Sequence, residues 1–256
     1  MTLPKSLTIL LSAVALASCD KNAVQDITGP APAARVRFFN FGVNAPAVNF
    51  HAGATKLTAI TSATGTESVL GVAYGGVGSA GFYAGLAPGP YVFAGKIAAA
   101  VDKDLAIATA SVTLVDGKNY SFYMSGIYDA TAKTVDAFVV EDAFVPTIDY
   151  SVAYVRFVNA ISNSVPMSMA AQNTVTAAVV PIGAAVAYRS GGEFIAVPGG
   201  IYDVSARAVG GTVNLITRTA LSFAPGRVYT VSSRGDMTVT STTATTRPIL
   251  DISANR

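Results

Sequence analysis

The chain has 256 residues, with 17 Lys and Arg against 15 Asp and Glu and a formal net charge of +2. Only 12% of its residues are charged, against about 25% in a typical globular protein. The near balance of charge, without a basic run, excludes a nucleic-acid-binding surface. The single cysteine excludes a disulfide within the chain. The low charge has two interpretations: a surface covered by Ser, Thr and small residues, which we favour, or a sizeable face buried against partner molecules.

Residues 1–19 read MTLPKSLTILLSAVALASC and have the features of a secretory signal. Lys5 is the only charge, and the apolar run over residues 7–17 is too short to span a bilayer as a helix. The run ends in Leu16-Ala17-Ser18-Cys19, which resembles the bacterial lipobox. That resemblance implies a signal peptide over residues 1–18 and lipidation of Cys19. The alternative is an ordinary signal peptide that leaves Cys19 as a free thiol.

Residues 19–33 are interpreted as the lipidated cysteine and a flexible tether, and after them one sequence pattern occurs twice. The segment VRFFN at residues 36–40 recurs as VRFVN at 155–159, and DGKNY at 116–120 recurs in order as PGRVY at 225–229. We therefore predict two domains, residues 34–145 and 151–256. The linker between them is short, so we expect the domains to sit end to end.

Alternating apolar and polar residues predict strands, for example over residues 106–114 and 120–125. In the second of these segments Tyr120, Phe122 and Met124 should face a core, while the intervening residues face water. No stretch predicts an amphipathic helix. With about seven short strands per copy, the pattern predicts an all-β fold of two tandem immunoglobulin-like β-sandwich domains.

The opening of the first copy, ARVRFFN at residues 34–40 and NAPAVNF at 44–50, resembles that of a bacterial domain-of-unknown-function family numbered 4397. The segments PGPYV at 88–92 and VDGKNYSF at 115–122 resemble later motifs of the same family. The resemblance covers most of residues 34–143 and, more weakly, 152–256. It implies a β-sandwich that is extracytoplasmic, often lipidated and often tandem, with no established activity. Asn40 and Asn159 stand where the family often has His.

Candidate residues for chemistry are few and scattered. His51 is the only histidine, and we expect a surface or half-buried side chain there rather than a catalytic base or a zinc ligand. Asp102-Lys103-Asp104 is interpreted as a hairpin turn rather than a calcium site. The acid pair Glu141-Asp142 is interpreted as a solvated strand end, and the glycines of residues 75–78 as a hairpin loop rather than a phosphate-binding loop.

Four tyrosines, Tyr74, Tyr83, Tyr123 and Tyr128, are candidates for a sugar-binding face, although tyrosines of sandwiches are more often half in the core. We therefore predict no catalytic, cofactor-binding or metal site, and Cys19 is the one residue with an assigned chemical role.

These observations together predict a non-enzymatic lipoprotein of the cell envelope, anchored to the membrane by lipid and extracytoplasmic, with a role in binding, adhesion or envelope assembly. One alternative is a structural subunit of a surface layer or fibre, since sheet edges can pair between molecules. Others are a carbohydrate-binding accessory protein and, last, a hydrolase. The expected partners are the membrane, through the anchor, and an envelope protein or glycan, with oligomers allowed and no nucleic acid or cofactor.

Overall fold

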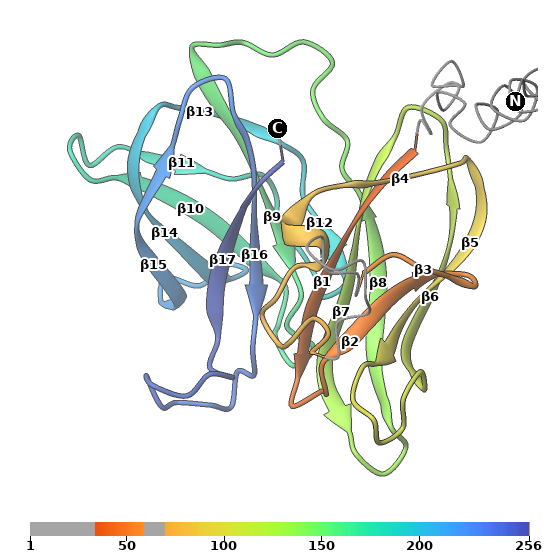
Figure 1. The fold of residues 1–256 in the computed structure, drawn as a ribbon. Helices are drawn as coiled ribbons and strands as arrows, with labels where there is room; N and C mark the ends of the chain where they lie inside the picture. The colour runs from red at the N-terminus through yellow and green to blue at the C-terminus, as the bar shows by residue number, and fades with distance from the viewer. Residues whose placement is uncertain (1–33, 59–69, 256) are drawn as a thin grey trace, which may run out of the picture. The chain divides into compact units, whose positions relative to one another are not determined.

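The computed structural model describes residues 34–58 and 70–255, which belong to one compact unit spanning residues 32–256. The predicted signal peptide, Cys19 and the whole predicted tether therefore lie outside the described residues. The all-β prediction is confirmed: strands and turns dominate the described residues, where η2 (Gly78–Gly81) is a short 3-10 turn (Figure 1). Within the described part of the chain, no helix has the length and apolar character needed to cross a membrane.

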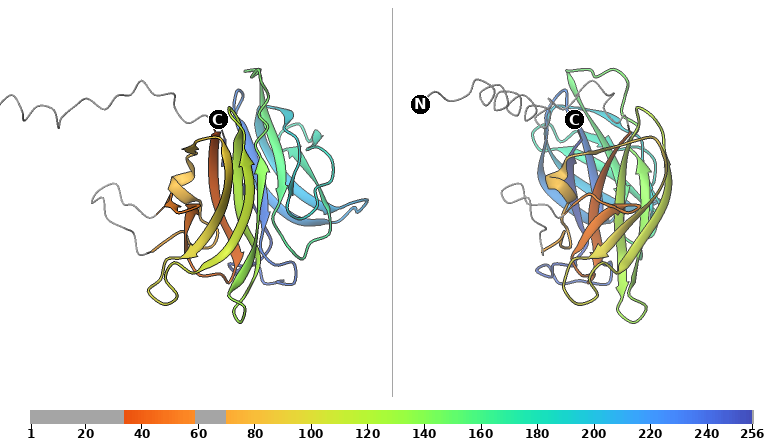
Figure 2. Two further views of the ribbon diagram at one scale, coloured as in Figure 1. Left: turned by 90° about the vertical axis from the view of Figure 1, so that its right-hand side faces the viewer. Right: turned by 45° about the vertical axis from the view of Figure 1, so that its right-hand side comes forward.

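Residues 34–58 and 70–142, called the first repeat below, form two four-stranded sheets in a sandwich-like arrangement (Figure 2). The sheets have the strand orders β4-β1-β7-β8 and β3-β2-β5-β6. The strands are β1 (Ala34–Val43), β2 (Val48–Ala52), β3 (Thr55–Lys56), β4 (Ala84–Leu86), β5 (Gly89–Ile97), β6 (Ala106–Leu114), β7 (Asn119–Asp129) and β8 (Thr134–Glu141).

Residues 152–255, called the second repeat, also form two sheets, with the orders β12-β9-β16-β17 and β11-β10-β14-β15. A further strand, β13, pairs with β9. The strands are β9 (Val152–Asn159), β10 (Met167–Asn173), β11 (Val179–Pro181), β12 (Ser190–Gly191), β13 (Ile195–Pro198), β14 (Gly200–Ala208), β15 (Asn214–Phe223), β16 (Val228–Arg234) and β17 (Ile249–Ala254).

The two repeats have the same strand pairing. In the first, β1 pairs antiparallel with β4 and parallel with β7; in the second, β9 pairs antiparallel with β13 and parallel with β16. The registers also agree, since Arg37 lies opposite Ser121 and Arg156 opposite Thr230. The sequence pattern that occurs twice therefore corresponds to one topology built twice.

Each repeat has its own hydrophobic core between its two sheets. The first core is centred on four phenylalanine rings with centroids 5.3 to 6.0 Å apart, namely Phe38, Phe50, Phe93 and Phe122. The second is mainly aliphatic, with Tyr202 and Phe223 as its aromatic members. Burial of this apolar surface is the main stabilising contribution to such a fold.

The strands β6 and β7 lie where the alternation predicts them, but the wet face expected for β7 is wrong. Ser121, Tyr123 and Ser125 point away from the first core, yet each is completely buried. The sheet of the second repeat that contains β9 covers this face, so both faces of β7 are enclosed.

A third apolar cluster joins the repeats through the sheets β4-β1-β7-β8 and β12-β9-β16-β17; we call this contact the seam. Its buried members are Phe39, Phe41, Tyr123, Phe138, Val158 and Ala160. The end-to-end arrangement expected from the short linker is therefore wrong. The repeats meet through sheet faces instead, because each presents a second apolar face that water would otherwise cover.

Candidate functional site: the polar seam between the repeats

The residues singled out in the sequence do not gather into a reaction centre. His51 lies in β2 and is buried, with 5% of its surface exposed. Asp102 and Asp104 lie in the turn between β5 and β6, where their carboxylates pair with Lys133 at 2.7 Å and with Lys56 at 3.7 Å. Across residues 34–58 and 70–255, no group of three or more His, Cys, Asp or Glu side chains could hold a metal ion.

The four candidate tyrosines do not form a common exposed face. Tyr123 is completely buried in the seam, and Tyr128 packs against the first core. The rings of Tyr83 and Tyr74 lie against arginines, Arg37 at 4.5 Å and Arg234 at 4.7 Å from the ring centroids. These tyrosines therefore serve mainly the interior of the protein.

The glycine loop at residues 75–78 runs beside β1 and supports a buried asparagine. The Gly75 amide donates to the carbonyl of Asn40 at 2.7 Å, and the Asn40 side chain donates to the carbonyl of Val72 at 2.8 Å. In the second repeat Asn159 donates to the carbonyl of Val186 at 3.3 Å. Both asparagines are completely buried, so each serves as a structural amide inside its repeat.

A charged network lies at one end of the seam, around Arg156. Its Nε donates to the Thr230 hydroxyl at 3.0 Å, its Nη1 to the carbonyl of Glu141 at 2.9 Å, and its Nη2 to the Asp142 carboxylate. The guanidinium stacks 4.7 Å from the centroid of the Phe194 ring. Each nitrogen of the Arg156 guanidinium therefore has a hydrogen-bond partner. The ion pair of Arg156 with Asp142 joins the two repeats.

Asp142 is not the solvated strand end that the sequence suggested, because its side chain is 0% exposed. It accepts hydrogen bonds from the Tyr83 hydroxyl at 2.6 Å and from the Ser121 hydroxyl at 2.8 Å. Burial and the charge of Asp142 raise the pKa of Tyr83 well above its usual range, so this hydroxyl stays protonated and donates. Its neighbour Glu141 behaves as expected and pairs with Lys118 at the surface.

The same arrangement recurs around Arg37, which occupies in the first repeat the position of Arg156 in the second. Arg37 Nη1 donates to the carbonyl of Ala254 at 2.9 Å, and the guanidinium stacks on the Tyr83 ring. Ala254 pairs with Tyr229 as Glu141 pairs with Tyr120. The contacts are thus reciprocal, as in a two-fold symmetric dimer.

The two sites differ in the residue that follows the last strand of each repeat. Asp142 follows β8, whereas Asn255 follows β17. Asn255 Nδ2 donates to the Thr230 hydroxyl at 3.0 Å, and its Oδ1 has no partner. Arg37 Nε and Nη2 have no protein acceptor either, although the side chain is only 2% exposed. Sequence alignment of the two repeats places the two arginines at matched positions, each within an apolar segment.

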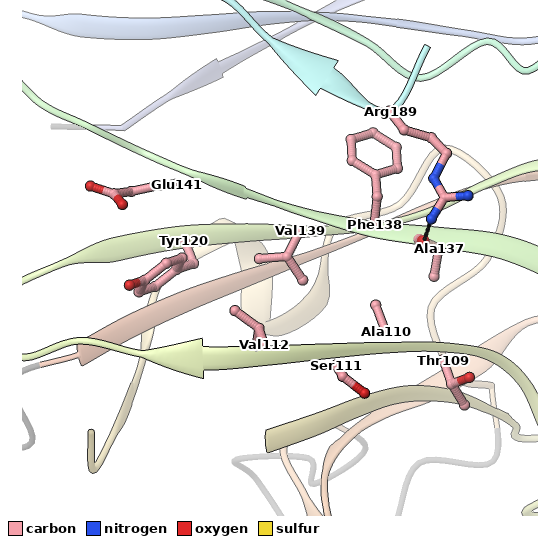
Figure 3. A pocket seen from close by; sticks show the side chains of 10 residues that line it. All are labelled: Thr109, Ala110, Ser111, Val112, Tyr120, Ala137, Phe138, Val139, Glu141 and Arg189. Atoms are coloured by element: carbon pink, nitrogen blue, oxygen red, sulfur yellow. Dashed lines mark hydrogen bonds between the residues drawn. The ribbon is translucent and has the colours of Figure 1, made fainter. Parts of the chain in front are cut away.

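A cavity of about 510 Å³ opens beside Arg37 and is lined by η2, by residues next to β4 and β16, and by the end of β17 with Asn255 after it. Among its described lining residues is a second cation, Arg227, and no acid, although the lining residue Tyr83 donates to the Asp142 carboxylate at 2.6 Å. A cavity of similar volume lies between β6 and β8 of the first repeat (Figure 3). There Arg189 donates to the carbonyl of Ala137 at 3.3 Å, and the other polar lining groups are the Glu141 carboxylate and the hydroxyls of Thr109, Ser111 and Tyr120. The cavity beside Arg37 is the stronger candidate site, because Nε and Nη2 of that arginine have no protein acceptor.

We also expect the protein to lose stability at high pH, because of a tyrosine in the seam, Tyr188. Burial and the negative charge of Asp136 raise the pKa of Tyr188, a seam residue, to about 12, against about 10 in an unfolded chain. Between these values the unfolded chain has released a proton that the folded chain keeps. The unfolding free energy should therefore fall as pH rises from about 10 towards 12. Urea unfolding at pH 8 to 11 measures this slope, and Tyr188→Phe should flatten it; an unchanged slope would refute the assignment.

A scan against protein-family models gives no match to this chain, and a search of curated proteins finds none that matches it.

Proposed function

We propose that this protein is a non-enzymatic, lipid-anchored protein of the cell envelope that presents two fused immunoglobulin-like domains for binding, adhesion or envelope assembly. The lipobox-like segment ending in Cys19 carries the proposal, because it is the one motif that specifies a chemical modification. A lipidated cysteine carries several acyl chains, each CH₂ contributing about 0.8 kcal/mol of membrane affinity. Such an anchor releases slowly.

The described residues support a display role rather than catalysis. The charged residues that the sequence analysis weighed as ligands or catalytic groups form ion pairs within the protein. Asp102 pairs with Lys133, Asp104 with Lys56, and Asp142 with Arg156. The seam joins both repeats into one unit through an apolar cluster and a buried ion pair. A rigid unit suits presentation of a binding surface, because little conformational freedom is lost on binding.

The pairing of strands supports the finer description of the fold. Each repeat has two facing sheets around its own core, and each repeat has its first strand parallel to its penultimate strand. The hydroxyl of Tyr120 accepts the Val115 amide at 3.1 Å, and that of Tyr229 accepts the Ala224 amide at 3.2 Å. A tyrosine whose hydroxyl bonds the backbone a few residues upstream is a feature of immunoglobulin-like sandwiches.

Lipidation is tested by growing cells that express the full chain with radiolabelled palmitate. The wild-type protein should carry label and sediment with membranes, whereas Cys19→Ser should lose both properties. Ser18→Ala serves as the matched control, because it keeps a small residue before the cysteine and should be labelled normally. Label that persists in Cys19→Ser would contradict the anchor.

A further inference from the structure

In the described part of the chain, four strands at sheet edges have six or more residues: β6, β8, β15 and β17. An unpaired strand edge presents amides and carbonyls that can pair with another chain, so proteins block such edges. Arginine side chains donate to two edge carbonyls of β8, at 3.3 and 2.9 Å, and to two of β17, at 2.7 and 2.9 Å. In β15 the left-handed residue Ala220, with φ of 56°, turns its amide onto the Asp203 carboxylate at 3.0 Å and interrupts the edge.

The edge of β6 has none of these protections. Its nine residues, AIATASVTL, contain no charge and no proline. The side chains of Thr109, Ser111 and Thr113 are exposed. Within residues 34–58 and 70–255, no backbone group outside β5 forms a hydrogen bond with these three residues. A long, uncharged edge of this kind is a place where a further strand can pair.

The pairing of β5 shows which backbone groups of β6 face outward. The carbonyl of Val92 accepts the amide of Gly53 at 2.9 Å on the side of β2, so the backbone groups of Val92 point away from β6. Val92 lies opposite Ser111, and the two residues of such a pair point their backbone groups away from each other. The N–H and C=O of Ser111 therefore face the outer edge, as do those of Thr109 and Thr113 by the period of two.

The cavity between β6 and β8 follows this edge (Figure 3). Four consecutive residues of β6, 109–112, line it. Because consecutive residues of a strand point to opposite faces, a cavity that all four line lies along the edge of β6 rather than over one face of the sheet. The outer edge of β6 is therefore open to an incoming strand.

We propose that β6 pairs antiparallel with β6 of a second copy of this chain, about a two-fold axis at Ser111. The sheet β3-β2-β5-β6 then continues across both molecules. In this register Ser111 lies opposite its own equivalent and Thr109 opposite Thr113, and each of these pairs exchanges two N–H···O bonds. On the other face of the sheet Ala110 lies opposite Val112. Pairs of hydroxyl side chains and of apolar side chains both stabilise cross-strand contacts.

The charges along the groove favour a second copy over an unrelated strand. Glu141 lines one end of the cavity and Arg189 the other (Figure 3). A two-fold axis between them exchanges the two ends, so Glu141 of each copy lies towards Arg189 of the other. The contact is thus self-complementary in charge as well as in hydrogen bonding, as an isologous interface requires.

Sedimentation equilibrium of the full-length protein in a density-matched nonionic detergent tests the pairing. The wild type should be a dimer in equilibrium with monomer. Ser111→Lys should raise the dissociation constant of the dimer by about tenfold or more, because it places two lysines directly opposite each other. The control is Ser222→Lys, which adds the same charge at an exposed position of β15 and should dimerise like the wild type.

Hydrogen–deuterium exchange locates the contact without a substitution. In the monomer the outward amides of Thr109, Ser111 and Thr113 exchange with solvent, whereas in the dimer they are hydrogen-bonded. Peptides that cover residues 106–114 should therefore exchange more slowly at high protein concentration than at low concentration. Peptides that cover β15 should exchange equally at both.

Three results would overturn the proposal. These are a wild type that stays monomeric at its highest soluble concentration, a Ser111→Lys protein that dimerises as tightly as the wild type, and a dimer whose protected amides lie outside residues 106–114. The inference rests on the proposed role in envelope assembly, to which it gives a partner. The pairing itself needs no lipid, so Cys19→Ser should still dimerise, and the labelling of Cys19 is decided separately.

Discussion

Replacing Asp142 by Asn should lower the unfolding free energy by about 3 kcal/mol, because it leaves the Arg156 charge buried without a counter-ion. The substitution keeps the shape of the side chain and one acceptor oxygen, so the loss comes mainly from the missing charge. Both side chains of the pair are at most 1% exposed. Water therefore cannot compensate. Urea unfolding followed by circular dichroism measures the change.

The matched control is Glu141→Gln in the adjacent residue. Glu141 also pairs with a cation, Lys118, but both side chains are more than a third exposed. Exposed pairs contribute little to stability because water and salt screen them. We therefore expect Glu141→Gln to unfold at nearly the same urea concentration as the wild type. If both substitutions lower the unfolding free energy equally, the buried pair contributes no more to stability than the exposed one.

Removing the Tyr123 ring by Tyr123→Ala should cost about 3–5 kcal/mol, as expected for a large aromatic residue in a packed core. The ring stacks between Phe39 at 4.6 Å and Phe138 at 5.1 Å, measured between centroids. Its hydroxyl lies 3.2 Å from that of Ser232 in the other repeat. The cavity left behind lies in the seam and loosens the contact between repeats.

Scanning calorimetry tests this second expectation. The wild type should unfold in one transition, whereas Tyr123→Ala should unfold at lower temperature and with separate transitions of the two repeats. Tyr123→Phe is the control, because it keeps the stacking and loses only a hydrogen bond worth about 0.5–1.5 kcal/mol. If the Ala and Phe variants lose equal stability, the ring has no role in joining the repeats.

The secondary structure could be predicted from local patterns, and the packing of the repeats could not. Alternation places β6 and β7 correctly because the period of two is a property of the strand itself. The same pattern predicts a wet face at Ser121, Tyr123 and Ser125, because small polar side chains are as compatible with a buried contact as with solvent. The other repeat of the same chain covers this face, an arrangement that neither interpretation of the low charge included.

The candidate site was missed for a related reason. Arg37 and Arg156 sit at matched positions in apolar segments, VRFFN and VRFVN, and a buried arginine at both places is a clue in principle. The counter-ion Asp142 lies only 14 residues from Arg156 in sequence but belongs to the other repeat, and its adjacency to Glu141 suggested a solvated strand end. Glu141 and Asp142 differ only in their place in the folded protein, where Asp142 is buried in the seam and Glu141 lies at the surface.

The reciprocal contacts of the seam have a consequence for how a site can diverge. Two separate copies of one repeat, meeting through the same faces, would form an isologous dimer in which both arginine sites are identical. Any change that opened one site to a ligand would then remove the counter-ion from both. Joining the copies in one chain lifts that constraint. Asp142 remains the counter-ion of Arg156, whereas Asn255 leaves Arg37 without a counter-ion and free to evolve a separate use.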